Sequence, residues 1–203
     1  MAKHKVFISY HHANDQWYKN KLLKINQIHD IFIDKSVDTG SINDNLPDER
    51  IREIIRDNYL QDSTVTILLV GTETKNRKHI DWEIYSSMYD GQVNKKSGVL
   101  VINLPSIGCT YYTASHADEK AKIYPQTESR ISIDNRAEYE SRYPYLPARI
   151  IDNLLKTGAK VSVVNWDKII NDLDGLKFLI DKTFDERTGC DYDLSSPMRR
   201  ANS

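Results

Sequence analysis

The stretch "TVTILLVGTETKNRKHIDWEIYSS", residues 64–87, joins an apolar run to a helical pattern and decides how this chain folds. Its first part, 64–71, is almost continuously apolar, as a strand covered on both faces of a sheet tends to be. After it, Ile80, Ile84 and Met88 recur at helical spacing, and the pattern stops at Gly91. A buried strand that leads directly into a helix is typical of a parallel sheet.

The same alternation continues on both sides of this stretch. Further β-rich runs stand at 5–10, 30–36, 98–105 and 159–166. Helical patterns stand at 16–25, 48–60, 148–158 and 167–184. Because each parallel crossover needs a helix to return the chain, this alternation predicts an α/β fold with a doubly wound parallel sheet of five strands.

Two segments fall outside the alternation. Residues 106–148 lack clear periodicity and hold six of the twelve tyrosines, although structureless connections beyond about 15 residues are uncommon in compact domains. We predict an irregular insertion between the fourth and fifth strands, packed over the sheet edge as a lid, a partner surface or a covering layer. Residues 191–203 indicate a flexible polar tail, which leaves 1–190 as a single domain.

Composition disfavours several classes of function. Lys plus Arg (28) nearly balance Asp plus Glu (29), so no summed field attracts nucleic acid or an anionic membrane. Cys109 and Cys190 have neither disulfide nor zinc spacing, and no segment approaches the roughly 20 apolar residues of a membrane span. We expect a cytoplasmic protein without nucleic-acid or membrane partners. We also expect no metal, because the adjacent His11 and His12 point apart.

The loops after the strands are the expected ligand sites, because doubly wound sheets bind ligands beyond the carboxyl ends of their strands. The polar residues at the ends of the first two strands are Ser9, Tyr10, His11, Asp34, Lys35 and Ser36. Asn14 and Asp15 follow the first strand and either belong to the same polar cluster or cap the next helix. A lysine near hydroxyl and backbone N–H groups can hold a phosphate. The glycine-rich and Walker motifs of dinucleotide-binding and P-loop proteins do not occur in the sequence.

Glu83 is the acid with the most informative position. At about 100° per residue, it lies beside the stripe of Ile80 and Ile84, so it should border the core and not bulk water. A carboxylate there could accept hydrogen bonds from ribose hydroxyls and stabilise positive charge at an anomeric carbon. The alternative is an acid in the first turns that complements the helix dipole.

Four blocks of sequence, taken in order, resemble a known family. They are "VFISYHHANDQWYKNKL", "DKSVDTGSI", "IRDNYLQDSTVTILLVGTETKNRKHIDWEIYSSM" and "NKKSGVLVINLP", within residues 4–105. They are similar to the TIR domain family, and within it to the TIR-like proteins of bacterial Thoeris anti-phage systems. The resemblance implies a flavodoxin-like fold and an enzyme that cleaves the nicotinamide–ribose bond of NAD+, its substrate, with no cofactor.

In that family an unidentified phage trigger starts the reaction. The product implied is a cyclic ADP-ribose isomer, a diffusible nucleotide signal that activates a partner effector which depletes NAD+. Matched position by position, the resemblance makes Glu83 the catalytic residue. The substrate-binding positions it implies are Phe7, Ser9, Tyr10, His11, Asp34, Lys35, Ser36, Gly71, Thr72 and Trp82. For Trp82, core packing is an equal alternative. The proline-bearing BB loop of TIR adaptors is not recognisable in "SVDTGSINDNLPDE", so self-association stays an expectation without a defined surface.

Two other functions fit the same residues. A non-catalytic TIR-fold sensor or scaffold would recruit the effector by direct contact, and Glu83 would then be structural. A nucleoside deoxyribosyltransferase has a related architecture and also uses a glutamate at an anomeric carbon, on a substrate without pyrophosphate. Release of nicotinamide from NAD+ separates the first function from both of these.

Overall fold

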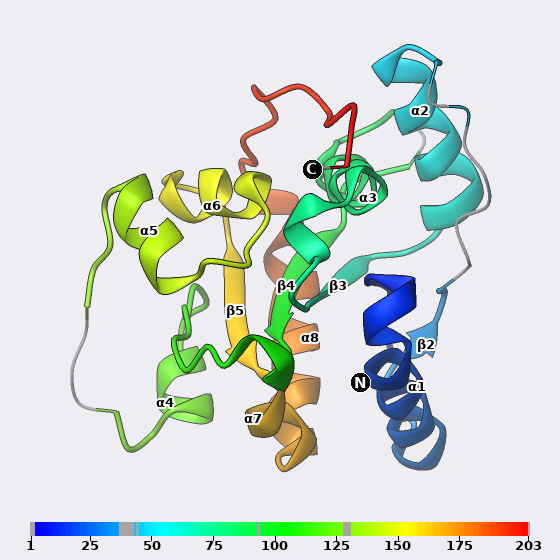
Figure 1. The fold of residues 1–203 in the computed structure, drawn as a ribbon. Coiled ribbons are helices and arrows are strands. Elements are labelled where there is room, and N and C mark those ends of the chain that lie inside the picture. The colour runs from blue at the N-terminus through cyan, green and yellow to red at the C-terminus, as the bar shows by residue number, and fades with distance from the viewer. Residues whose placement is uncertain (1–2, 37–42, 44, 93, 128–130, 203) are drawn as a thin grey trace.

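A parallel sheet of five strands forms the centre of the protein, in the order β2-β1-β3-β4-β5 (Figure 1). The computed structural model describes residues 3–36, 43, 45–92, 94–127 and 131–202. The strands are β1 (Lys5–Ser9), β2 (Ile33–Asp34), β3 (Val65–Val70), β4 (Gly98–Asn103) and β5 (Val161–Asn165). This order confirms the predicted flavodoxin-like, doubly wound fold. Strand order reverses between β1 and β3, where ligands of such folds bind.

One face of the sheet is covered by α1 (His12–His29), α7 (Trp166–Ile170) and α8 (Leu173–Glu186). Alternate residues of the strands point to this side, because successive side chains of a strand point to opposite faces. Val6 and Ile8 of β1 pack there in one cluster with Leu22 of α1 and with Leu176 and Leu179 of α8. All five are at most 2% exposed.

The opposite face is covered by α2 (Asp48–Ile54), the π-helix η1 (Ile55–Leu60), α3 (Lys78–Met88) and α6 (Ala148–Leu155). The short 3₁₀ turn η2 (Thr74–Asn76) connects β3 to α3. Ile80 and Ile84 of α3 pack on Leu68 and Val70 of β3, which is the apolar stripe that the sequence predicts. Helices therefore lie on both faces, as the alternation of patterns requires.

Three element boundaries differ from the prediction. The run at 30–36 pairs with β1 only through Ile33 and Asp34. The pattern at 167–184 is two helices, because the Asp172 side chain accepts a hydrogen bond from the Gly175 N–H and starts α8 afresh. The pattern at 48–60 changes from α- to π-helix at Ile55.

The insertion packs over the free edge of β5, as predicted, and contains η3 (Pro105–Ile107), α4 (Glu119–Ile123) and α5 (Arg136–Arg142) (Figure 1). Thr113 forms an antiparallel bridge with Val163 of β5. Glu119 is fully buried and accepts a hydrogen bond from Ser162 Oγ at 2.5 Å. The insertion also reaches the turn after β3, where the Pro144 oxygen accepts a hydrogen bond from Lys75 Nζ at 2.7 Å.

The C-terminal residues follow a packed path after the 3₁₀ turn η4 (Arg187–Gly189). The sequence indicates a flexible tail at 191–203, but described residues of this segment bond to α3 and α6, and Met198 is 3% exposed. Among the described residues, no helix has the length and apolarity to cross a membrane.

Candidate functional site

Glu83 and Ser9 form a buried pair at the point where strand order reverses. Glu83 lies in α3 and is 5% exposed, in agreement with its position beside the stripe of Ile80 and Ile84. Ser9 is the last residue of β1 and is fully buried. Its Oγ donates a hydrogen bond to Glu83 Oε2 at 2.6 Å. A buried acid needs such a partner, and the bond fixes the direction of the carboxylate.

Phe7 and Trp82 lie on the same side of the sheet as this pair but inside the packed core. Phe7 is 1% exposed and Trp82 is fully buried, and both belong to one cluster with Met198. The indole Nε1 of Trp82 donates to the backbone oxygen of Arg199 at 2.7 Å. The sequence left core packing and substrate contact as equal alternatives for Trp82. In the structure Trp82 is packed in the core.

The residues after β2 lie beside the first strand. The Ile8 N–H donates to Ser36 Oγ at 3.1 Å, and the Lys35 N–H donates to the backbone oxygen of Val6 at 2.8 Å. Asp34 is exposed, and its Oδ1 accepts from the Ser36 N–H. The next part of the predicted loop, residues 37–42 and 44, lies outside the described residues.

Tyr10 packs away from Ser9, on the other face of the sheet, whereas His11 lies close enough to Arg77 to respond to its charge. Tyr10 is 5% exposed, packs in the cluster of the α1 and α8 face, and donates from its hydroxyl to Gln16 Oε1 at 2.7 Å. His11 precedes α1, and burial, together with the positive charge of Arg77, lowers the pKa of its imidazole. The structure brings Ser9, Glu83 and Ser36 to the end of β1, whereas Tyr10 faces the other core.

Gly71 and Thr72 follow β3, and Gly71 is in close contact with Asp15, which the sequence left as part of the polar cluster after the first strand or as a helix cap. The Gly71 N–H donates to Thr74 Oγ1 at 2.8 Å. A Cβ atom at Gly71 would lie 2.4 Å from both carboxylate oxygens of Asp15, so only glycine admits this approach. Asp15 is 2% exposed. Its Oδ2 has no hydrogen-bond partner among the described residues.

Burial raises the pKa of Asp15 from 3.8 to about 6, and a hydrogen bond from the His11 backbone opposes this rise. In the sequence Asp15 is indistinguishable from an ordinary helix-capping acid. The enclosure of Asp15 depends on Gly71, which follows β3 and has no side chain between its backbone and the Asp15 carboxylate. The candidate site therefore contains two buried acids, Glu83 of α3 at the end of β1 and Asp15 of α1 against the end of β3.

Replacing Asp15 by asparagine should flatten the pH dependence of stability. Because the folded pKa lies above the unfolded value, the folded state holds the proton more tightly between pH about 4 and 6. The free energy of unfolding of the natural protein should therefore fall as the pH rises from about 4 to about 6. The contribution of Asp15 to this fall is at most about 3 kcal/mol, at about 1.4 kcal/mol per pKa unit. Urea unfolding at pH 4, 5, 6 and 7 measures the difference between natural protein and variant.

The control for this prediction is Asp118→Asn. Asp118 is exposed and has a φ of 63°, a left-handed conformation that asparagine tolerates. Its substitution should leave the slope of stability against pH unchanged. An Asp15→Asn slope equal to that of the natural protein would contradict the raised pKa.

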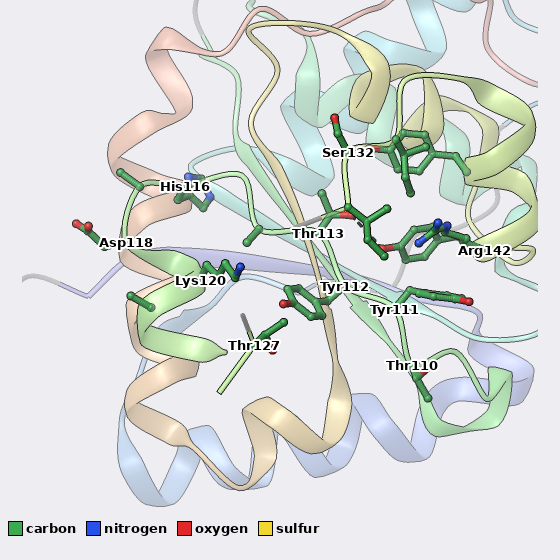
Figure 2. A pocket seen from close by; sticks show the side chains of 17 residues that line it. Thr110, Tyr111, Tyr112, Thr113, His116, Asp118, Lys120, Thr127, Ser132 and Arg142 are labelled. Atoms are coloured by element: carbon green, nitrogen blue, oxygen red, sulfur yellow. Dashed lines mark hydrogen bonds between the residues drawn. The ribbon is translucent and has the colours of Figure 1, made fainter. Parts of the chain in front are cut away.

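A cavity of about 750 Å³ lies within the insertion (Figure 2). Figure 2 shows His116 and Asp118 toward one end and Tyr111 and Arg142 toward the other. Tyr143, with its hydroxyl 3.1 Å from Thr113 Oγ1, also lines it. None of the predicted site residues lines this cavity, which belongs to the β5 edge of the sheet.

No group of three His, Cys, Asp or Glu side chains in the described part of the chain could hold a metal ion. The side chains at the end of β1 are instead hydroxyls and a carboxylate, which can bind sugar hydroxyls and stabilise a cation. The site could therefore act on a glycosidic bond through charge stabilisation by Glu83.

The doubly wound parallel sheet and the buried glutamate after its third strand define an α/β domain of flavodoxin-like topology with an acid at the end where such sheets bind ligands. Residues 7–107 match the family model described as "Thoeris protein ThsB, TIR-like domain". The chain therefore belongs to the Thoeris ThsB TIR-like family. A search of the curated proteins gave no match. The matched region includes both members of the Ser9–Glu83 pair.

Proposed function

We propose that this protein is a TIR-type NAD+ glycohydrolase and cyclase of an anti-phage system. It cleaves the nicotinamide–ribose bond of NAD+ and releases a cyclic ADP-ribose isomer. This product activates a partner effector that depletes cellular NAD+. The proposal rests on the family and on one observation above all, the buried Glu83 carboxylate held by the Ser9 hydroxyl at the ligand-binding end of the sheet.

Cleavage of the nicotinamide–ribose bond requires few protein groups beyond Glu83 and Ser9. Nicotinamide leaves as a neutral pyridine, so its departure needs no strong general acid. The ribose that remains carries positive charge at its anomeric carbon, and the Glu83 carboxylate stabilises this charge. Ser9 keeps the carboxylate oriented through its 2.6 Å hydrogen bond. A carboxylate held in advance costs no reorganisation during the reaction.

Cyclisation adds one requirement, because a nucleophile elsewhere on the same molecule must reach the anomeric carbon before water does. The substrate must therefore bind folded, in a partly closed site. Residues 34–36 lie beside the end of β1, and Lys35 is the cation there that could pair with the pyrophosphate.

Mass spectrometry of small molecules tests this function. Cells that express the protein should accumulate nicotinamide and a new ADP-ribose species of the mass of NAD+ minus nicotinamide after phage infection. Cells that carry an empty vector should not. The extract should then switch on NAD+ depletion by the partner effector in vitro, which links the small molecule to the response.

The outcome that contradicts the proposal is protection from phage without nicotinamide release and without an active extract. That result would support a scaffold that recruits the effector by direct contact. Resting protein alone is not the test, because the activity is expected only after the phage trigger, so extracts from infected cells are the sample to compare.

A further inference from the structure

The C-terminal residues 193–202, here called the C-terminal strap, cross α6 and the start of α3 and reach toward α2 (Figure 1). At α3 the strap makes three backbone-directed hydrogen bonds. The Arg199 N–H donates to Asp81 Oδ2 at 2.8 Å, the Lys78 N–H donates to Asn202 Oδ1 at 3.0 Å, and the Trp82 indole donates to the Arg199 oxygen. The first turns of α3 are thus held from outside by the strap.

Arg149 of α6 joins the strap to α3. Its side chain is 2% exposed and makes two hydrogen bonds to the Asp81 carboxylate, from Nε at 2.8 Å and from Nη2 at 3.1 Å. Nη1 donates to the Ser196 oxygen and Nη2 to the Pro197 oxygen, each at 3.1 Å. The planar guanidinium can bind a carboxylate and two carbonyls at once, which a lysine cannot.

The strap also contacts α2 and the core beneath the site. Arg200 donates from Nη1 to the Leu46 oxygen at 2.9 Å and pairs with Asp48 at the start of α2. Met198 packs in the cluster that contains Phe7 and Trp82. Phe7 lies two residues before Ser9 and Trp82 lies next to Glu83, so one apolar side chain of the strap belongs to the same cluster as residues close in sequence to both members of the pair.

We propose that Arg149 and the C-terminal strap position α3 so that Glu83 stands at Ser9 in the geometry that the reaction needs. Arg149 is then a positioning residue, which acts through Asp81 and the strap and does not touch substrate. The inference rests on the proposed function. A displacement of about 1 Å at a reacting group can cost about 100-fold in rate, so a small shift of α3 should reduce turnover well before the fold is lost.

The test compares Arg149→Lys with the natural protein in nicotinamide release, with both proteins taken from phage-infected cells and assayed at a temperature well below the melting point of both. We expect kcat to fall at least about 10-fold while KM for NAD+ changes little, because the substrate-binding residues keep their places. Arg142→Lys is the matched control. Arg142 pairs with Glu138 within α5, away from both the strap and α3, and its substitution should change neither constant.

A truncation after Ser195 provides a second variant. It removes the bonds of the strap to Asp81, Lys78 and Trp82 and should lower kcat in the same way. Hydrogen exchange gives a readout that does not depend on activity. Amides of α3 should exchange faster in both variants, whereas amides of β3 and β4 should keep the protection they have in the natural protein.

The outcomes separate this inference from the proposed function. If the natural protein from infected cells releases no nicotinamide, the proposed function fails, and exchange in α3 alone decides whether the strap holds the helix. If the natural protein is active and both variants keep its kcat, the positioning role is overturned. A loss of protection over the whole sheet would show a purely structural role and would also overturn it.

Discussion

Replacing Glu83 by glutamine should reduce nicotinamide release from NAD+ by at least about 100-fold, the scale on which preorganised charge stabilisation contributes to catalysis. Glutamine has nearly the same shape, and its amide oxygen can still accept the hydrogen bond from Ser9 Oγ. What it lacks is the negative charge that stabilises the developing cation. The measurement is nicotinamide release in extracts of phage-infected cells, followed by chromatography, with circular dichroism of the purified variant to show that it is folded.

Glu119→Gln is the matched control for this substitution. Glu119 is also a fully buried glutamate, and it also accepts a hydrogen bond from a serine, Ser162, at 2.5 Å. It lies at the β5 edge, within the insertion and away from the end of β1. Its substitution should leave nicotinamide release close to that of the natural protein. An active Glu83→Gln variant would remove the proposed mechanism, and equal losses in the two variants would point to damaged folding.

The same pair of variants separates the enzyme from a scaffold in cells. If the small molecule carries the signal, Glu83→Gln should lose protection against phage together with the product. Protection that survives in a folded but inactive variant would mean that the chain acts by contact. Glu119→Gln should protect in either case, because it keeps both the surface of the domain and Glu83.

The fold could be predicted because its evidence is local. β3 and β4 are buried on both faces and therefore appear as continuous apolar runs, and α3 shows its apolar stripe at helical spacing. The edge strand β2 carries less information, since Ile33 is 43% exposed and only two residues pair. The break between α7 and α8 depends on one cap at Asp172, which resembles any other helical acid in the sequence.

The candidate site could be predicted only in part, for a similar reason. The burial of Glu83 follows from the period of one helix, and its approach to Ser9 follows from the rule that strand ends meet at one edge of the sheet. The enclosure of Asp15 depends on Gly71, and the path of the strap depends on carbonyl groups that bind Arg149. Every residue has a backbone carbonyl, so the sequence does not indicate which carbonyls will bind Arg149. For this reason the polar C-terminal segment could not be predicted to pack on α3 and α6.

Replacing Gly98 by alanine should give the largest loss of stability among single substitutions of the glycines in the described residues. Gly98 begins β4, which lies between β3 and β5, and its N–H donates to the Thr64 oxygen. A Cβ atom there would lie 2.2 Å from the Thr183 carbonyl oxygen and 2.6 Å from Thr183 Cγ2, so α8 must move away from the sheet. We expect a loss of about 3 kcal/mol and a fall of about 6–12 °C in Tm, measured by calorimetry.

The carbonyl, and not the methyl group of Thr183, should account for most of this loss. Thr183→Ser removes Cγ2 but leaves the backbone oxygen in place, so the double variant with Gly98→Ala should recover only a small part of the stability. Gly189→Ala is the control, because nothing lies within 4 Å of a Cβ at that position, and its stability should stay within about 0.5 kcal/mol of the natural protein. Full recovery of stability in the double variant would contradict this prediction. It would mean that the added Cβ atom clashes only with Thr183 Cγ2 and that the backbone of α8 does not have to move.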